Sequence, residues 1–182
     1  MLFCFDFSIF KYMRVFVGLP APANIVKQTV DWQIANESLP VRWIRPEDLH
    51  LTLLPPWETA DVEATIKQFQ VLPAAKIVRI DFNCLELGPN PREPRLIWLT
   101  GRLIESPLDN YLKILADGLN QPLPARRFLP HLTVARFRFL KQPLILSELI
   151  AWSAGFTRMV LYQSDLGPQG ARYAVLAQKE LL

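Results

Sequence analysis

The chain has 182 residues, of which 51% are hydrophobic and 20% charged, and its formal net charge is +3. This composition excludes a disordered chain, and no apolar run approaches the roughly 18–20 residues of a membrane-spanning helix. Two Cys and two His without CxxC or HExxH spacing argue against a disulfide-stapled scaffold and a protein-built zinc site. We therefore expect a globular, mildly basic, cytoplasmic protein without a metal or cofactor.

The first residues differ in character from the rest. Residues 1–12 read MLFCFDFSIFKY, which is apolar but lacks the basic start and cleavage site of a signal peptide. We predict a tail over residues 1–12 and a single two-lobed domain over residues 13–182. A mobile or artefactual tail and an additional edge strand are the alternatives for residues 1–12.

Strand and helix signals alternate along the first half. Short runs of β-branched and aromatic residues predict strands, apolar residues at helical spacing predict helices, and Pro and Gly predict connections. The expected elements are a strand at 13–19, a helix at 23–36, a strand at 49–54 ended by Pro55-Pro56, a helix at 60–70 capped by Thr59, and a strand at 76–87.

The second half repeats this order. It predicts a strand at 95–100, a helix at 107–119, a strand at 131–137, a helix at 143–152, and strands at 156–162 and 171–177 around a turn at Gly167–Gly170. The segment from Met13 to His50 is nearly as long as that from Arg95 to His131. We therefore predict an α+β fold of two similar lobes, with antiparallel sheets and helices packed outside.

Both histidines stand in the same short motif. His50 begins His-Leu-Thr-Leu, and His131 begins His-Leu-Thr-Val. Alternate side chains of a strand share a face, so each His lies beside the Thr two residues later while the intervening apolar residues face the core. A lone His in an apolar strand is usually a packed residue, but the same tetrapeptide at equivalent positions of a repeat favours a shared catalytic site.

The chemistry of this motif suits a phosphate substrate. A pseudo-two-fold relation between the lobes would bring His50, Thr52, His131 and Thr133 to one cleft. A neutral imidazole can then remove a proton from a nucleophile while a protonated one gives a proton to the leaving oxygen. The hydroxyls can hold the phosphate oxygens by hydrogen bonds.

Arginines flank both motifs: Arg42 and Arg45 before the first, and Arg126, Arg127, Arg136 and Arg138 around the second. Their planar donors suit phosphate, with an ordinary solvated face as the alternative for Arg42, Arg127 and Arg138. Arg136 is predicted to bind phosphate. Strict alternation would turn it away from His131, so this prediction requires a bulge or the strand end.

Three aromatic residues, Trp43, Trp57 and Phe128, are candidates for stacking on a base, with core packing expected for at least two of them. The sequence leaves open whether Asp165 and the turn at Gly167–Gly170 reach the cleft.

Together these features resemble the 2H phosphoesterase superfamily, and within it the bacterial and archaeal RNA 2′,3′-cyclic phosphodiesterases, also called 2′-5′ RNA ligases. The two His-x-Thr-x motifs are the superfamily's signature. The similarity runs from MRVFVGL at Met13 through RWIRPEDLHLTL, PRLIWL and FLPHLTVARF to VLYQSDLGPQGARYAVLAQKELL at the end. The chain departs from the family after the first motif, where it reads Leu-Pro-Pro-Trp-Glu in place of a Phe-Leu-Gly-type turn, and this departure bears on substrate choice.

The resemblance implies a bilobal fold with a central cleft, and metal-independent hydrolysis of 2′,3′-cyclic phosphate RNA ends to 2′-phosphates, with a reversible, ATP-independent 2′-5′ RNA ligase activity as a further expectation. It implies that His50 is the catalytic acid and His131 the base, and that Thr52, Thr133 and Arg136 bind the phosphate. The expected partners are RNA ends or nucleotides with a 2′,3′-cyclic phosphate, and we expect a monomer without membrane contact. The alternatives are a phosphodiesterase for small cyclic phosphates or 2′-5′ oligoadenylates, and a non-catalytic module that binds RNA ends.

Overall fold

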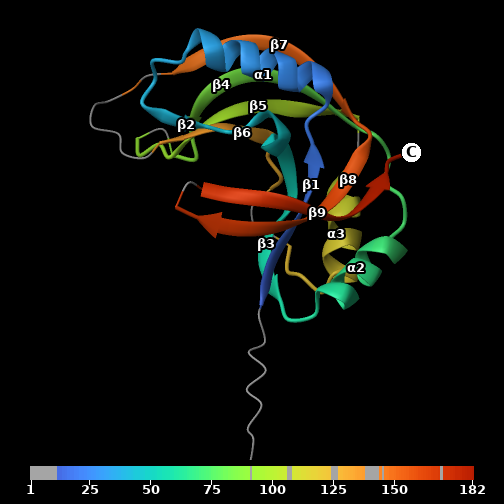
Figure 1. Ribbon diagram of the computed structural model, residues 1–182. Helices are drawn as coiled ribbons and strands as arrows, with labels where there is room; N and C mark the ends of the chain where they lie inside the picture. The colour runs from blue at the N-terminus through green and yellow to red at the C-terminus, as the bar shows by residue number, and fades with distance from the viewer. Residues whose placement is uncertain are drawn as a thin grey trace, which may run out of the picture.

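A curled antiparallel sheet with helices against it forms the fold (Figure 1). The structure is a computed structural model and describes residues 12–90, 92–105, 108–123, 127–137, 144, 146–168 and 170–182. Its described part contains nine strands in one sheet and three α-helices, so the predicted α+β class with antiparallel strands is confirmed. The predicted tail lies outside the described residues except for Tyr12.

The order of the strands divides the sheet into two lobes. One lobe has the order β3 (His50–Thr59), β1 (Met13–Pro20), β8 (Arg158–Gly167) and β9 (Gly170–Glu180). The other has β7 (Ser147–Phe156), β4 (Val78–Gly88), β5 (Leu96–Glu105) and β6 (His131–Phe137), with β2 (Val41–Trp43) also paired to β6. The lobes meet where Leu51 of β3 pairs with Leu132 of β6, and both leucines are fully buried.

Two of the three helices pack on the lobe opposite to the strand that precedes them. Helix α1 (Ala23–Ala35) contacts β7, whereas α3 (Leu108–Gly118) contacts β3 and α2 (Val62–Val71) contacts β9. Figure 1 accordingly shows α1 across one lobe, and α2 and α3 together on the other. The buried positions of each helix recur about once per turn, as a helix with one face on a sheet requires. Helices α1 and α3 thus each pack on the lobe opposite to the strand that precedes them, whereas α2 packs on the lobe of the strand before it.

The predicted repeat is visible in the strand pairing. In the first lobe β1 pairs with β3, and Pro20 lies opposite His50. In the second lobe β5 pairs with β6, and Thr100 lies opposite His131. The residue before each histidine makes an equivalent backbone contact. The carbonyl of Leu49 accepts a hydrogen bond from the Ala21 amide, and the carbonyl of Pro130 accepts one from the Gly101 amide.

One predicted helix is wrong. Residues 147–156 form strand β7, although the apolar residues of 143–152 have helical spacing, and Pro143 itself lies outside the described residues. Strand β7 pairs along β4 from Val78 to Glu86. Without this partner β4 would leave a row of backbone groups unpaired, so long-range pairing overrides the local pattern.

The predicted end of the first motif strand and the predicted cap also differ from the structure. Strand β3 continues through Pro55-Pro56 to Thr59, and these prolines fall between Leu54 and Trp57, where the register with β1 shifts and a missing N–H removes no regular pairing. Helix α2 is capped by Asp61, whose side chain accepts a hydrogen bond from the Ala64 amide at 2.9 Å, and not by Thr59.

Candidate active site

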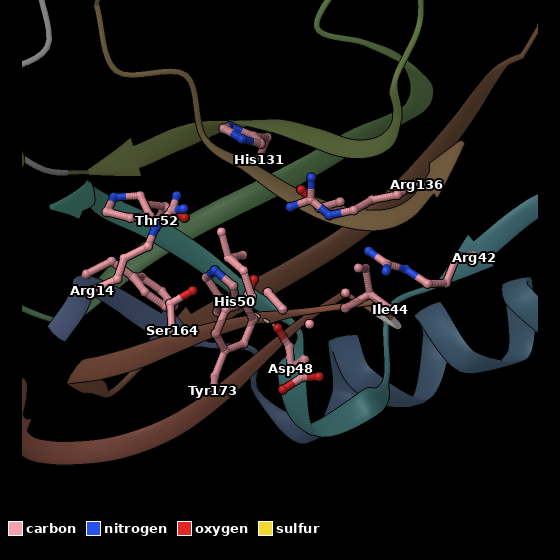
Figure 2. A pocket seen from close by; sticks show the side chains of 17 residues that line it. Arg14, Arg42, Ile44, Asp48, His50, Thr52, His131, Arg136, Ser164 and Tyr173 are labelled. Atoms are coloured by element: carbon pink, nitrogen blue, oxygen red, sulfur yellow. Dashed lines mark hydrogen bonds between the residues drawn. The ribbon is translucent and has the colours of Figure 1, made fainter. Parts of the chain in front are cut away.

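One cavity between the lobes contains all five residues predicted for the site. His50 and Thr52 enter it from β3, and His131, Thr133 and Arg136 enter it from β6 (Figure 2). Its volume is about 400 Å³. Each His and each Thr is half-buried, while the leucine between them is fully buried. The alternation of the two strands therefore brings both polar pairs to one cleft, as the sequence predicts.

The two imidazole rings are held by the same backbone contact. The Nδ1 atom of His50 lies 2.6 Å from the carbonyl oxygen of Asp48, and the Nδ1 atom of His131 lies 2.8 Å from that of Leu129. A carbonyl oxygen only accepts hydrogen bonds, so Nδ1 carries the proton in both rings. The Nε2 atoms are left to exchange a proton with a ligand in the cavity.

Aromatic side chains fix the orientation of each ring. The His50 ring packs 4.9 Å from Phe16 and edge-on, at 5.1 Å, to Tyr173. The His131 ring lies 4.4 Å from Trp98 at an interplanar angle of 33°. These contacts limit rotation of the imidazoles, so their hydrogen-bonding directions are set before a ligand arrives.

Burial makes both histidines weaker bases than usual. Desolvation lowers the pKa of His50 below 6.5, against the opposing hydrogen bond to the Asp48 carbonyl, and the charges of Arg136 and His131 lower it further. Desolvation also lowers the pKa of His131 below 6.5, and its hydrogen bond to Leu129 opposes the shift. Burial therefore favours the neutral form of both imidazoles in the unliganded cleft, and a bound anion would favour their protonation.

A bulge in β6 turns Arg136 into the cavity. Thr133 pairs with Trp98 and Ala135 pairs with the adjacent Ile97, so β6 contains one extra residue at this point. Val134 and Ala135 are consequently both buried, and Arg136 returns to the face of His131. The bulge that the Arg136 prediction required is present.

Strand β3 has a similar irregularity with a different outcome. Leu53 and Leu54 are both buried, and the position that corresponds to Arg136 is Pro55. Pro56 lines the cavity and Pro55 lines a second one beside it. The two lobes thus present equivalent His and Thr side chains but only one arginine after the motif, and the segment that departs from the family pattern does border the site.

Sequence reasoning missed several residues of the cavity. Arg14 and Phe16 reach it from β1, and the paired residues Ser164 and Tyr173 reach it from β8 and β9. Alternation along β1 could have indicated Arg14, whereas no local pattern distinguishes Tyr173 from any other strand tyrosine. Gly167 and Gly170 also line the cavity, so the turn that the sequence left open does reach it.

The remaining candidates have other positions. Arg45 lies at the rim, where its Nε and one terminal nitrogen each lie 2.7 Å from a carboxylate oxygen of Asp48. Trp43 and Trp57 pack against the core, in line with the expectation for two of the three aromatics. Arg127 and Phe128 line the second cavity, and Arg126 and Arg138 lie outside the described residues.

The second cavity adjoins the first and is mostly apolar. The two share Thr52 and His131, and the second has a volume of about 710 Å³. Its wall includes the Trp98 ring, which packs over Gly88, where a side chain would come within 2.5 Å of the indole. The pair of cavities gives one polar site for an anion with an apolar space beside it.

No group of three or more His, Cys, Asp or Glu side chains in the described part of the chain is arranged to hold a metal ion. None of the helices in that part is long and apolar enough to cross a membrane.

No protein-family model matches the chain. The chain is 24% identical over 176 residues to a protein of Methanocaldococcus jannaschii described as an RNA 2′,3′-cyclic phosphodiesterase, with 91% of this chain and 99% of that protein covered.

Solved structures show the same fold. TT0787 of Thermus thermophilus matches with a TM-score of 0.74 and 21% identity, covering 93% of this chain and 98% of that one. E. coli LigT in complex with 3′-AMP matches with a TM-score of 0.70 and 24% identity, covering 94% and 99%. The chain thus has the fold of TT0787 and LigT, and its likeness to the RNA 2′,3′-cyclic phosphodiesterase extends over nearly the whole of both chains.

Proposed function

We propose that the protein is a phosphodiesterase that hydrolyses RNA 2′,3′-cyclic phosphate ends to 2′-phosphates, and that joins such an end in a 2′-5′ linkage, reversibly, when the 5′-hydroxyl of another strand replaces water as the nucleophile. The observation that carries this proposal is the pair of imidazoles whose Nδ1 atoms are both engaged by carbonyls, so that both Nε2 atoms are available to one cavity. The relative named RNA 2′,3′-cyclic phosphodiesterase supports this choice of substrate.

The proposed step is an in-line displacement at phosphorus. The neutral Nε2 of His131 takes a proton from water, whose oxygen forms a bond to phosphorus as the bond from phosphorus to the ribose 3′-oxygen breaks. The protonated Nε2 of His50 gives its proton to that departing oxygen, which leaves a 2′-phosphate and a 3′-hydroxyl. The step consumes one water molecule, and it leaves a proton on His131 in place of the proton that His50 has lost.

The other cavity residues hold the phosphate during this step. The hydroxyls of Thr52 and Thr133 donate hydrogen bonds to its non-bridging oxygens, and the Arg136 guanidinium faces its charge. The bound anion also favours protonation of His50, which offsets the burial and the Arg136 charge that lower the pKa of this group in the empty cleft.

The assignment of acid and base can be tested with an activated substrate. An aryl phosphodiester with a nitrophenolate leaving group needs little protonation but still needs a base to activate water. His50→Ala should therefore retain a larger fraction of activity on this compound than on a cyclic nucleotide, whereas His131→Ala should lose activity on both. If His131→Ala instead selectively retains activity on the aryl phosphodiester, His131 is the acid and His50 is the base.

The activity itself is tested by incubating the protein with a 2′,3′-cyclic phosphate-ended oligonucleotide in EDTA. We expect turnover, with the phosphate of the product on the 2′-oxygen. Binding without turnover would favour the alternative of a module that recognises RNA ends. Turnover of 2′-5′ oligoadenylate alone would favour that substrate class.

A further inference from the structure

Two arginines lie directly opposite each other at the outer end of the cleft. Arg42 of β2 and Arg136 of β6 are cross-strand partners, and both are half-buried. Among the described residues neither forms an ion pair with a carboxylate. Like charges at directly opposed positions destabilise a sheet, so this pair indicates an anion that binds there.

The position of Arg42 is built into the fold. Its guanidinium lies against Gly170, the first residue of β9, where any side chain would collide with it. Gly170 also has a φ of +108°, which glycine adopts readily and other residues rarely. The turn between β8 and β9 thus leaves the room that Arg42 occupies beside the cleft.

A recess of about 360 Å³ continues the cleft beyond this pair. Its charged lining comprises Arg42, Arg45, Asp48, Arg136 and Arg172, and the Asp48 carboxylate is already engaged by Arg45. Trp43 and Tyr173 complete an aromatic part of the wall. The recess therefore has more positive charge than its own carboxylate can balance.

Arg42 and Arg136 have different relations to the histidines. Arg136 is close enough for its charge to act on His50, and Figure 2 shows Arg42 on the far side of Arg136 from both imidazoles. Both arginines line the catalytic cavity and the outer recess, but Arg136 is the one beside the phosphate in the proposed reaction, so Arg42 is available to a second anion in the recess.

We propose that Arg42, together with Arg172, forms a second phosphate subsite that binds the 5′-phosphate of the terminal nucleotide. This inference rests on the proposed function and narrows its substrate. In an RNA strand that phosphate joins the terminal nucleotide to the rest of the chain. The enzyme accordingly selects strand ends over free cyclic nucleosides, since only the former carry the second phosphate. The planar donor fork of arginine suits this group.

The test compares adenosine 2′,3′-cyclic phosphate with the same compound carrying a 5′-phosphate. For the wild type, kcat/KM should be about tenfold or more higher with the 5′-phosphate, mainly through a lower KM. In Arg42→Gln this ratio should fall close to one, and Arg42→Lys should recover part of it. Arg79→Gln, the same charge change at an exposed position of β4, is the matched control and should keep the wild-type ratio.

Calorimetry of the product analogues adenosine 2′-phosphate and adenosine 2′,5′-bisphosphate measures the subsite without turnover. The wild type should prefer the bisphosphate, and Arg42→Gln should lose that preference while melting no lower than the wild type, because the opposed like charge is gone. Equal affinity of the wild type for both analogues, or an unchanged preference in Arg42→Gln, would overturn the subsite. A retained preference without turnover of either cyclic compound would instead refute the proposed function alone.

Discussion

Each imidazole of the cleft uses one nitrogen for structure and leaves the other for chemistry. Nδ1 of His50 and of His131 donates to the carbonyl two residues earlier, so the backbone just before each strand determines the tautomer. The chemistry then depends on how many protons the two Nε2 atoms share. Because burial lowers both pKa values, the two imidazoles become protonated at a lower pH than an ordinary histidine does.

The pH dependence follows from these directions. The active form carries one proton on the pair, so its population peaks between the two macroscopic pKa values of the free enzyme. Because both are lowered from 6.5, we expect a bell-shaped profile of kcat/KM with its maximum below pH 6.5. Steady-state rates with a cyclic nucleotide across pH measure this profile. An optimum above pH 7 would contradict the lowered values.

Arg136 affects the same titration from a distance. Its charge lowers the pKa of His50, so Arg136→Gln should raise that pKa, whereas the pKa of His131 should move less. The chain has only two histidines, so imidazole NMR titrations resolve both directly. Arg136→Lys keeps the charge and serves as the control. An unchanged His50 titration in Arg136→Gln would mean that the two groups do not face the same cavity.

The sequence predicted the positions of the motif residues better than those of the residues around them. The repeated His-Leu-Thr motif identified four cavity residues, because strand alternation is a local rule. Arg136 could be included only on the assumption of a bulge. Tyr173 and Ser164 were missed because their place in the cavity depends on the pairing of β8 with β9 and of β8 with β1, which no local pattern encodes.

At the scale of elements, a buried side chain from a helix holds the bulge of β6. The amide nitrogen of Gln33 in α1 donates to the carbonyl of Val134 at 3.1 Å and to that of Ile44 at 3.0 Å. Val134 is the extra residue, and its carbonyl also accepts from the Ile44 amide. The bulge therefore has partners for its displaced backbone, and these partners set where Arg136 leaves the strand.

Gln33→Met tests this link. It keeps the approximate shape of the side chain but removes both donors, which should lower the free energy of unfolding by about 1–3 kcal/mol. It should also raise KM several-fold, because Arg136 is no longer held in place. Gln28→Met on the same helix is the control, and denaturant unfolding with steady-state kinetics provides both readouts. If Gln33→Met is destabilised but has a normal KM, then the contacts of Gln33 at the bulge do not contribute to phosphate binding.

The elements also show where local patterns fail. Strands β1 and β6 and helix α1 were predicted within a residue or so, because their periodicity and Pro boundaries are local. The residues of β7 were predicted as a helix, because Leu146, Leu149 and Ile150 have helical spacing. Their conformation is decided by β4, a partner more than sixty residues earlier in the chain.

At the scale of the whole molecule, the cleft depends on the contact between the lobes. Leu51 and Leu132 form the pairing that joins β3 to β6, and each stands between the His and Thr of its motif. Their burial therefore both connects the lobes and aims the two polar pairs into the same space. The sequence predicted two similar lobes from the repeat, but it did not predict that α1 and α3 each pack on the opposite lobe.

Leu51→Ala should lower the free energy of unfolding by about 2–5 kcal/mol, since it leaves a cavity between the lobes. Leu149→Ala in β7 is the control, because that side chain is 86% exposed and its loss should change stability little. Denaturant unfolding of both variants gives the comparison. Equal stability of Leu51→Ala and the wild type would show that the lobes are held together elsewhere.

The proposed function requires His50 and His131 to act together on one phosphodiester bond. The decisive measurement is kcat of His50→Ala, His131→Ala and the double variant on a 2′,3′-cyclic phosphate-ended oligonucleotide. Each single variant should lose about 10²–10⁴-fold, and the double variant should lose far less than the product of the two, because both groups serve the same transition state. Near-normal turnover in either single variant, with the fold intact, would contradict the account.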